Sequence, residues 1–180
     1  MIYARYKFNI TLIEFTLEFH HYKQGSTMNL TITPSQLGDK PPVTKAYPAF
    51  IQQIGEARFR EMISQHYELL KESSIKDLFP IDDPQEFADA KKHAADFMIQ
   101  ICGGPAYFNA SRGAPQMGRR HAPFAITAEA RVVWLELYAE VLAPLVDDGV
   151  SEENIESFWR YLEVFSKHMV NTPSSNTFKF

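Results

Sequence analysis

His121 lies in the segment MGRRHAPF at residues 117–124, directly after two arginines and directly before Ala-Pro-Phe. Pro123 limits how far a helix can continue past the histidine, because proline lacks the amide donor and restricts the residue before it. Arg119 and Arg120 put two cations beside the imidazole, which is unusual for a histidine that only fills a core. The pattern predicts a short helix end that presents an imidazole to a bound group, with positive charge for an anionic partner.

The elements that must position this segment are predicted to be helices. Apolar side chains recur at three- and four-residue steps, and Thr and Ser stand where helix N-caps are expected. The predicted helices cover 59–70 and 87–101 and begin after Thr127 and Ser151. Residues 103–118 are rich in Gly and Pro and predict a long irregular connection, which is usually functional inside a compact domain. No strand pattern follows residue 45, so we expect an all-α fold.

Composition favours one globular domain. The chain has 180 residues, is 45% hydrophobic and carries a net charge of −4 without long charge runs, which argues against disorder and against nucleic acid as a partner. One cysteine, Cys102, excludes an internal disulfide and fits the reducing cytoplasm. No stretch approaches the roughly 18 apolar residues of a membrane span, so no membrane partner is expected.

The N-terminal part differs from the rest of the chain. Residues 1–27 are rich in aromatic side chains, and Met28 begins a segment of ordinary composition, so we expect Met28 to be the natural start. The expected organisation is an extension and lead-in over 1–45, a helical domain over 46–172 and a tail over 173–180.

The usual catalytic motifs are missing, which leaves few kinds of chemistry. The sequence contains no Gly-rich phosphate loop, nucleophile elbow or Cys-x-x-Cys motif. A haem site needs less: one axial histidine, an apolar slot between helices and cations for the two propionates. His121 supplies the imidazole, and Arg112, Arg119 and Arg120 are candidate cations. In the alternative interpretation, His121 caps or fills a helix end and the arginines are solvated.

Two further side chains favour the haem hypothesis. Tyr67 lies on the apolar face of the first predicted helix, where a buried hydroxyl would need a partner. Trp134 lies near the start of the third predicted helix and carries an N–H group that can only donate. Each residue alone is typical of a core, but together with His121 they resemble a ligand site.

From about Tyr47 to Asn171 the chain resembles a truncated haemoglobin, most closely group II of that family. Several separated motifs in the family's order carry the resemblance: Phe59 with His66-Tyr67, Leu78-Phe79-Pro80, Gly103-Gly104-Pro105, Arg112-Gly113, Arg120-His121-Ala122-Pro123-Phe124 and Trp134. The spacing from Gly103 through His121 to Trp134 matches without a gap. The resemblance implies a two-over-two helical sandwich around haem b.

The resemblance also implies a role for each site residue. His121 would be the proximal iron ligand, and Tyr67 and Trp134 would donate hydrogen bonds to a ligand on the opposite face. The remaining haem contacts that it implies are Phe79, Ala90, His93, Ala94, Phe97, Met98, Arg112, Arg120 and Phe124.

Some features of the distal helix and the connection before it bear on these assignments. The connection between Phe79 and Ala90 is slightly long, and Ala90 occupies the gate position. Ala94 is smaller than the expected apolar residue, which predicts a roomier pocket. His93 could meet a propionate, face solvent or act as a sixth iron ligand.

These residues predict a protein that binds dioxygen, NO and CO at a five-coordinate haem iron. Bound dioxygen carries partial negative charge, so two donors would slow its release and favour sensing or reaction with NO or peroxide over bulk transport. Dioxygenase or peroxidase-like turnover would need an electron donor, which the sequence does not identify. The alternatives are a haem-free helical regulatory or interaction domain, and an electron-transfer protein with His93 and His121 as two axial ligands.

Overall fold

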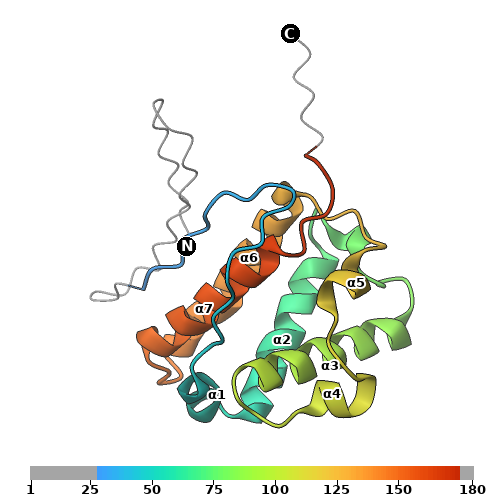
Figure 1. Ribbon diagram of the computed structural model, residues 1–180. Coiled ribbons are helices and arrows are strands. Elements are labelled where there is room, and N and C mark those ends of the chain that lie inside the picture. The colour runs from blue at the N-terminus through green and yellow to red at the C-terminus, as the bar shows by residue number, and fades with distance from the viewer. Residues whose placement is uncertain (1–27, 175–180) are drawn as a thin grey trace, which may run out of the picture.

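The computed structural model describes residues 28–174, and it contains helices and no strands over that range (Figure 1). The expected N-terminal extension over 1–27 lies outside the described residues. The elements are α1 (Pro48–Ile54), α2 (Glu56–Lys71), η1 (Lys76–Leu78), α3 (Pro84–Ile101), α4 (Tyr107–Arg112), α5 (Met117–His121), α6 (Ala128–Leu142), η2 (Ala143–Val146) and α7 (Glu152–Lys167). The all-α prediction is therefore confirmed.

The long helices form two pairs that pack on each other. Helix α2 packs on α3 and also on α6, while α7 lies along α6 (Figure 1). A cluster of buried phenylalanines joins the pairs: the ring of Phe50 from α1 stacks on Phe158 from α7, with centroids 4.7 Å apart, and Phe59 from α2 meets Phe158 edge-on at 5.6 Å. The result is the expected two-over-two sandwich.

Side-chain capping bonds mark the start of two of the long helices, α3 and α6. The Asp83 carboxylate accepts hydrogen bonds from the amides of Gln85 and Glu86 at the start of α3. The Thr127 hydroxyl accepts from the Ala130 amide at 3.2 Å, so the predicted cap of α6 is confirmed. Ser151 does precede α7, but its hydroxyl makes no capping bond, and that part of the prediction is wrong.

The connection over residues 103–118 is more regular than expected. Gly103 ends α3 with φ +82°, a conformation that favours glycine, but α4 then forms within the segment. Phe108 of α4 is buried in the core, and the Gln100 side chain accepts from the Asn109 amide at 3.1 Å. A six-residue helix with one buried aromatic shows no periodicity, which is why the sequence did not predict it.

The lead-in is extended, as expected, and packs on α7. Leu30 and Ile32 are buried, and the indole of Trp159 donates to the Thr31 carbonyl at 3.0 Å. No helix in the described part of the chain is both long and apolar enough to cross a membrane.

Candidate functional site

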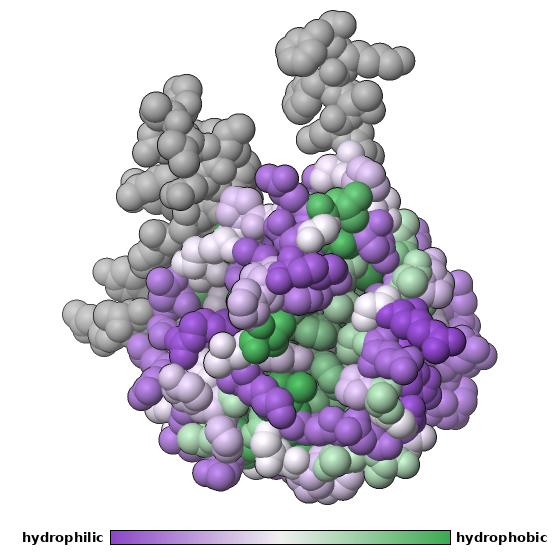
Figure 2. Space-filling view, in the orientation of Figure 1, coloured by the Kyte–Doolittle hydropathy of each residue, from purple (hydrophilic) through white to green (hydrophobic). Residues whose placement is uncertain are grey.

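An apolar cavity of about 310 Å³ opens between α3 and the α4–α5 segment and reaches α2, α6 and α7. Figure 2 shows a hollow on this face with apolar side chains inside and hydrophilic ones around its edge. All the site residues expected from the sequence border this cavity: Tyr67, Phe79, Ala90, His93, Ala94, Phe97, Met98, Arg112, Arg120, His121, Phe124 and Trp134. The structure therefore brings these residues together around one cavity.

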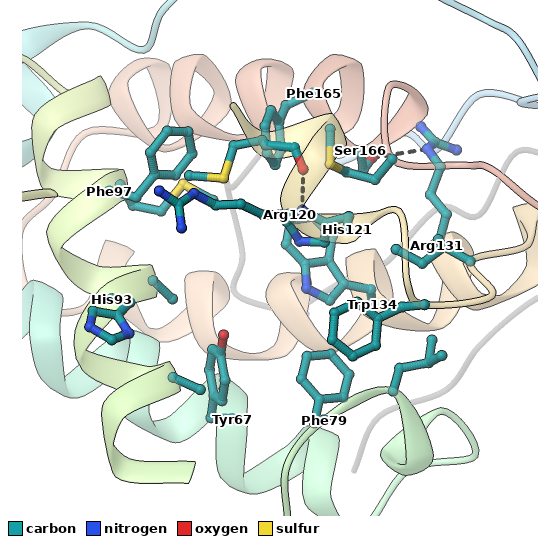
Figure 3. Close-up of a pocket in the computed structure, with 18 of the residues that line it drawn as sticks. Tyr67, Phe79, His93, Phe97, Arg120, His121, Arg131, Trp134, Phe165 and Ser166 are labelled. Carbon is teal, nitrogen blue, oxygen red and sulfur yellow. Dashed lines mark hydrogen bonds between the residues drawn. The ribbon is translucent and has the colours of Figure 1, made fainter. Parts of the chain in front are cut away.

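His121 is the last residue of α5, and its ring is fixed by the backbone (Figure 3). Its Nδ1 lies 2.8 Å from the Met117 carbonyl oxygen. Because a carbonyl only accepts, Nδ1 carries the proton, and Nε2 is left with a free lone pair. Beyond the helix, the Asn171 side-chain amide donates to the carbonyls of His121 and Phe124 at 3.1 and 2.9 Å. A protonated Nδ1 bound to a backbone carbonyl leaves Nε2 free, which is the tautomer expected of a metal-binding imidazole.

Tyr67 from α2 and Trp134 from α6 bring two donors to the cavity, and the Tyr67 hydroxyl points into it (Figure 3). Neither the hydroxyl nor the indole N–H has a hydrogen-bond partner among residues 28–174. The Tyr67 ring is held edge-on by Phe79, with centroids 5.7 Å apart, and by Phe87 at 5.8 Å. Burial raises the pKa of Tyr67 to about 12, so the hydroxyl stays protonated at neutral pH.

The walls of the cavity between the donors and His121 are apolar. Phe97 of α3 meets Phe108 of α4 at 5.6 Å and Phe165 of α7 at 5.7 Å between ring centroids. Sequence reasoning did not assign Phe108 or Phe165 to the site. Phe165 was visible as a member of the apolar face of its helix, but nothing in the sequence showed that this face borders a cavity.

The mouth of the cavity carries positive charge on its α4–α5 side, where Arg112 and Arg120 lie. Nη1 of Arg112 lies 3.3 Å from Nε2 of His93, and this contact joins the end of α4 to α3. Partial burial, followed by the charges of Arg112 and Lys92, lowers the pKa of His93. Arg120 is tied to its own loop instead, since it donates to the carbonyls of Pro115 and Arg112 at 2.8 and 2.9 Å.

A buried polar network behind the cavity was not expected from the sequence. Arg131 of α6 borders the cavity and donates to Glu163 Oε1 at 2.5 Å, to Ser166 Oγ at 2.9 Å and to the Thr33 carbonyl at 2.9 Å. These bonds connect α6, α7 and the lead-in. Over residues 28–174, no group of three or more His, Cys, Asp and Glu side chains could together hold a metal ion.

Comparison with known proteins gives consistent matches. A family model described as bacterial-like globin matches residues 49–171. The group 2 truncated hemoglobin YjbI of Bacillus subtilis (strain 168) is 27% identical over 128 residues, which are 71% of this chain and 92% of that protein. The crystal structure of phosphate-bound Hell's gate globin IV has a TM-score of 0.69 at 32% identity, covering 76% of this chain and 83% of that one. The truncated oxygen-avid haemoglobin from Bacillus subtilis has a TM-score of 0.60 at 27% identity, covering 68% and 98%.

Paired helices surround an apolar cavity that His121 borders, an arrangement that fits a haem protein of the globin class, in which one histidine holds the iron. This chain belongs to the bacterial-like globin family, and its relatives confirm the resemblance to group II truncated haemoglobins. Its cofactor is therefore haem, and its ligands are diatomic gases such as oxygen.

Proposed function

We propose that the cavity holds haem b, with Nε2 of His121 as the proximal iron ligand. The tautomer supports this assignment: the Met117 carbonyl takes the proton of Nδ1, so Nε2 is the nitrogen that can coordinate. Phe97, Phe108 and Phe165 supply an apolar wall for a flat macrocycle. When bound, the haem iron would supply one open coordination position for O₂, NO or CO.

The propionates would meet the positive mouth of the cavity. Arg112 is exposed and its guanidinium contacts the His93 ring at the rim, so both side chains are available there. Because the His93 ring is engaged at the rim by Arg112, the contact favours the propionate role over that of a sixth iron ligand. Arg120, which donates to the backbone carbonyls of Arg112, Ala114 and Pro115, would mainly hold the segment that leads to His121.

The two unpartnered donors would set how long a gas molecule stays. Tyr67 and Trp134 can donate to a ligand between them without breaking any bond within the described residues. A hydrogen bond to a charged acceptor contributes about 1.5–3 kcal/mol, and each ~1.4 kcal/mol is tenfold in an equilibrium constant. Slow release suits reaction or sensing more than bulk transport. The relative described as oxygen-avid supports this direction.

Turnover with NO or peroxide is the finer part of the proposal. It would require an electron donor to return the protein to its ferrous state, and that partner is unidentified. We place the reaction in the cytoplasm, as the single cysteine suggests. Reduction by cell extract of the purified ferric protein, followed by NO consumption, would support turnover.

The His121 tautomer carries the proposal, and haem titration tests it. The full chain is titrated with haemin, and ferrous spectra are recorded before and after CO for the wild type and for His121→Ala. We expect one haem per chain and a Soret band that shifts with CO, with both features lost or altered in His121→Ala. His168→Ala is the matched control, because His168 also meets a backbone carbonyl, that of Pro41 at 2.7 Å. A six-coordinate ferrous spectrum before CO would contradict the open position.

A further inference from the structure

His66 is a fully buried histidine of α2, and it has no role in haem or gas binding as proposed above. Its Nε2 lies 3.1 Å from the main-chain carbonyl oxygen of Trp134 in α6. Since the carbonyl only accepts, Nε2 must donate, and Nδ1 is then a lone pair with no partner in the described structure. Burial lowers the pKa of His66 to about 3, so the ring is neutral.

The ring of His66 also packs against aromatic side chains of α6. It stacks on Tyr138 with centroids 3.6 Å apart and planes 28° apart. It meets Trp134 edge-on at 5.6 Å and Tyr67 edge-on at 6.2 Å. Trp134 and Tyr138 are one helical turn apart, so the stack and the hydrogen bond together restrict both sliding and rotation of α6 against α2.

Leaving Nδ1 buried and unpaired costs free energy that an apolar ring of similar shape would avoid. A phenylalanine could keep the stack on Tyr138 but could not donate to the Trp134 carbonyl. The feature that only the histidine supplies is therefore the bond to the backbone of the residue that carries the indole donor.

We infer that His66 is a positioning residue that sets the separation of the two ligand donors, Tyr67 and Trp134. It adjoins Tyr67 in the chain and holds the Trp134 backbone directly, so it links the two helices at the level of the donors. Small misplacement weakens a hydrogen bond steeply, so loss of the link reduces gas retention through Trp134. This inference rests on the proposed function.

A double-mutant cycle on the full haem-loaded protein tests the inference. The O₂ dissociation rate is measured for His66→Phe and His66→Gln, and for His66→Phe in a Trp134→Phe background. We expect His66→Phe to raise the rate about three- to tenfold, and His66→Gln, whose amide nitrogen can replace Nε2, to stay within about twofold of wild type. In the Trp134→Phe background, the same change should have less than about a twofold effect.

The C–O stretching band of the CO complex gives a second readout, because it shifts with donors near the ligand. It should move in His66→Phe and return in His66→Gln. His168→Phe removes another histidine–carbonyl bond remote from the donors, and should lower the melting temperature without changing the rate or the band.

An unchanged rate in His66→Phe, or an equal rise in both backgrounds, overturns the positioning role. If Tyr67→Phe and Trp134→Phe also leave the rate unchanged, the part of the proposed function that assigns gas retention to these two donors fails, whereas absence of haem uptake would refute the proposed function itself. If His66→Phe does not fold, ¹⁵N NMR of the unsubstituted protein decides: we expect a proton on Nε2 and no titration between pH 5 and 8, and a proton on Nδ1 overturns the inference.

Discussion

Replacing Tyr67 with phenylalanine isolates the contribution of one hydroxyl to gas retention. The ring of residue 67 should stay in place, because Phe79, Phe87 and His66 hold it through ring contacts at 5.7, 5.8 and 6.2 Å. The hydroxyl has no partner among residues 28–174, so its removal leaves no protein group unpaired. The variant therefore loses only a donor that faces the cavity.

The magnitude follows from the kind of bond that is lost. A hydrogen bond to a charged acceptor is worth about 1.5–3 kcal/mol, which corresponds to about 10- to 150-fold in the dissociation rate. Trp134 remains and can take up part of the interaction, so the lower end is expected, at least about tenfold. Since burial raises the Tyr67 pKa to about 12, the rate of the wild type should be constant between about pH 6 and 10.

Stopped-flow displacement of O₂ by CO from the ferrous protein measures this rate directly. The melting temperature of the haem-free protein serves as the control, and it should be unchanged or slightly higher in Tyr67→Phe, because no bond within the described residues is lost. An unchanged O₂ dissociation rate would remove Tyr67 from the ligand site. A lower melting temperature with an unchanged rate would assign the hydroxyl a structural role instead.

Three further predictions concern acid stability, haem retention and packing. Because the folded pKa of His66 is depressed to about 3, its contribution to stability is lost as pH falls below the unfolded value of about 6.5. Below pH 6.5 the free energy of unfolding of the wild type should therefore drop relative to that of His66→Phe by about 1.4 kcal/mol per pH unit. Denaturant titrations of both proteins from pH 7 to 4.5 measure this difference. If both free energies change in parallel with pH, the prediction is wrong. Arg112→Ala should speed haem transfer to an acceptor globin about two- to fivefold, as expected for an exposed charge contact, whereas Arg119→Ala, whose guanidinium bonds Gln116, should not. Gly104→Ala would place a Cβ 2.6 Å from Ile99 Cγ2 and should cost about 1–3 kcal/mol in thermal unfolding, while Gly118→Ala, with open space around it, should cost nothing.

The sequence predicted the long helices, and it singled out residues that line one cavity, for the same physical reason. Apolar residues at helical spacing determine which face of α2 or α3 is buried, and Tyr67 lies on such a face. The spacing from Gly103 through His121 to Trp134, which matches that of the family, then places the His121 segment beside the cavity. The sequence could not show which polar side chains pair over a long range. Arg131 looks like a solvated charge until the fold places Glu163, 32 residues away, beside it. The short helix α4 was missed because one buried aromatic, Phe108, gives no period to detect.

The unpartnered donors of the cavity connect stability with function. Tyr67 and Trp134 each bring a polar hydrogen into a largely apolar space, where a protein optimised only for folding would have placed phenylalanine or leucine. Tyr67 and Trp134 border the cavity together with the imidazole of His121, which indicates that the free energy the two unpaired donors cost is offset only when something fills the space. The polar groups of this cavity are thus arranged for a ligand that the fold alone does not supply.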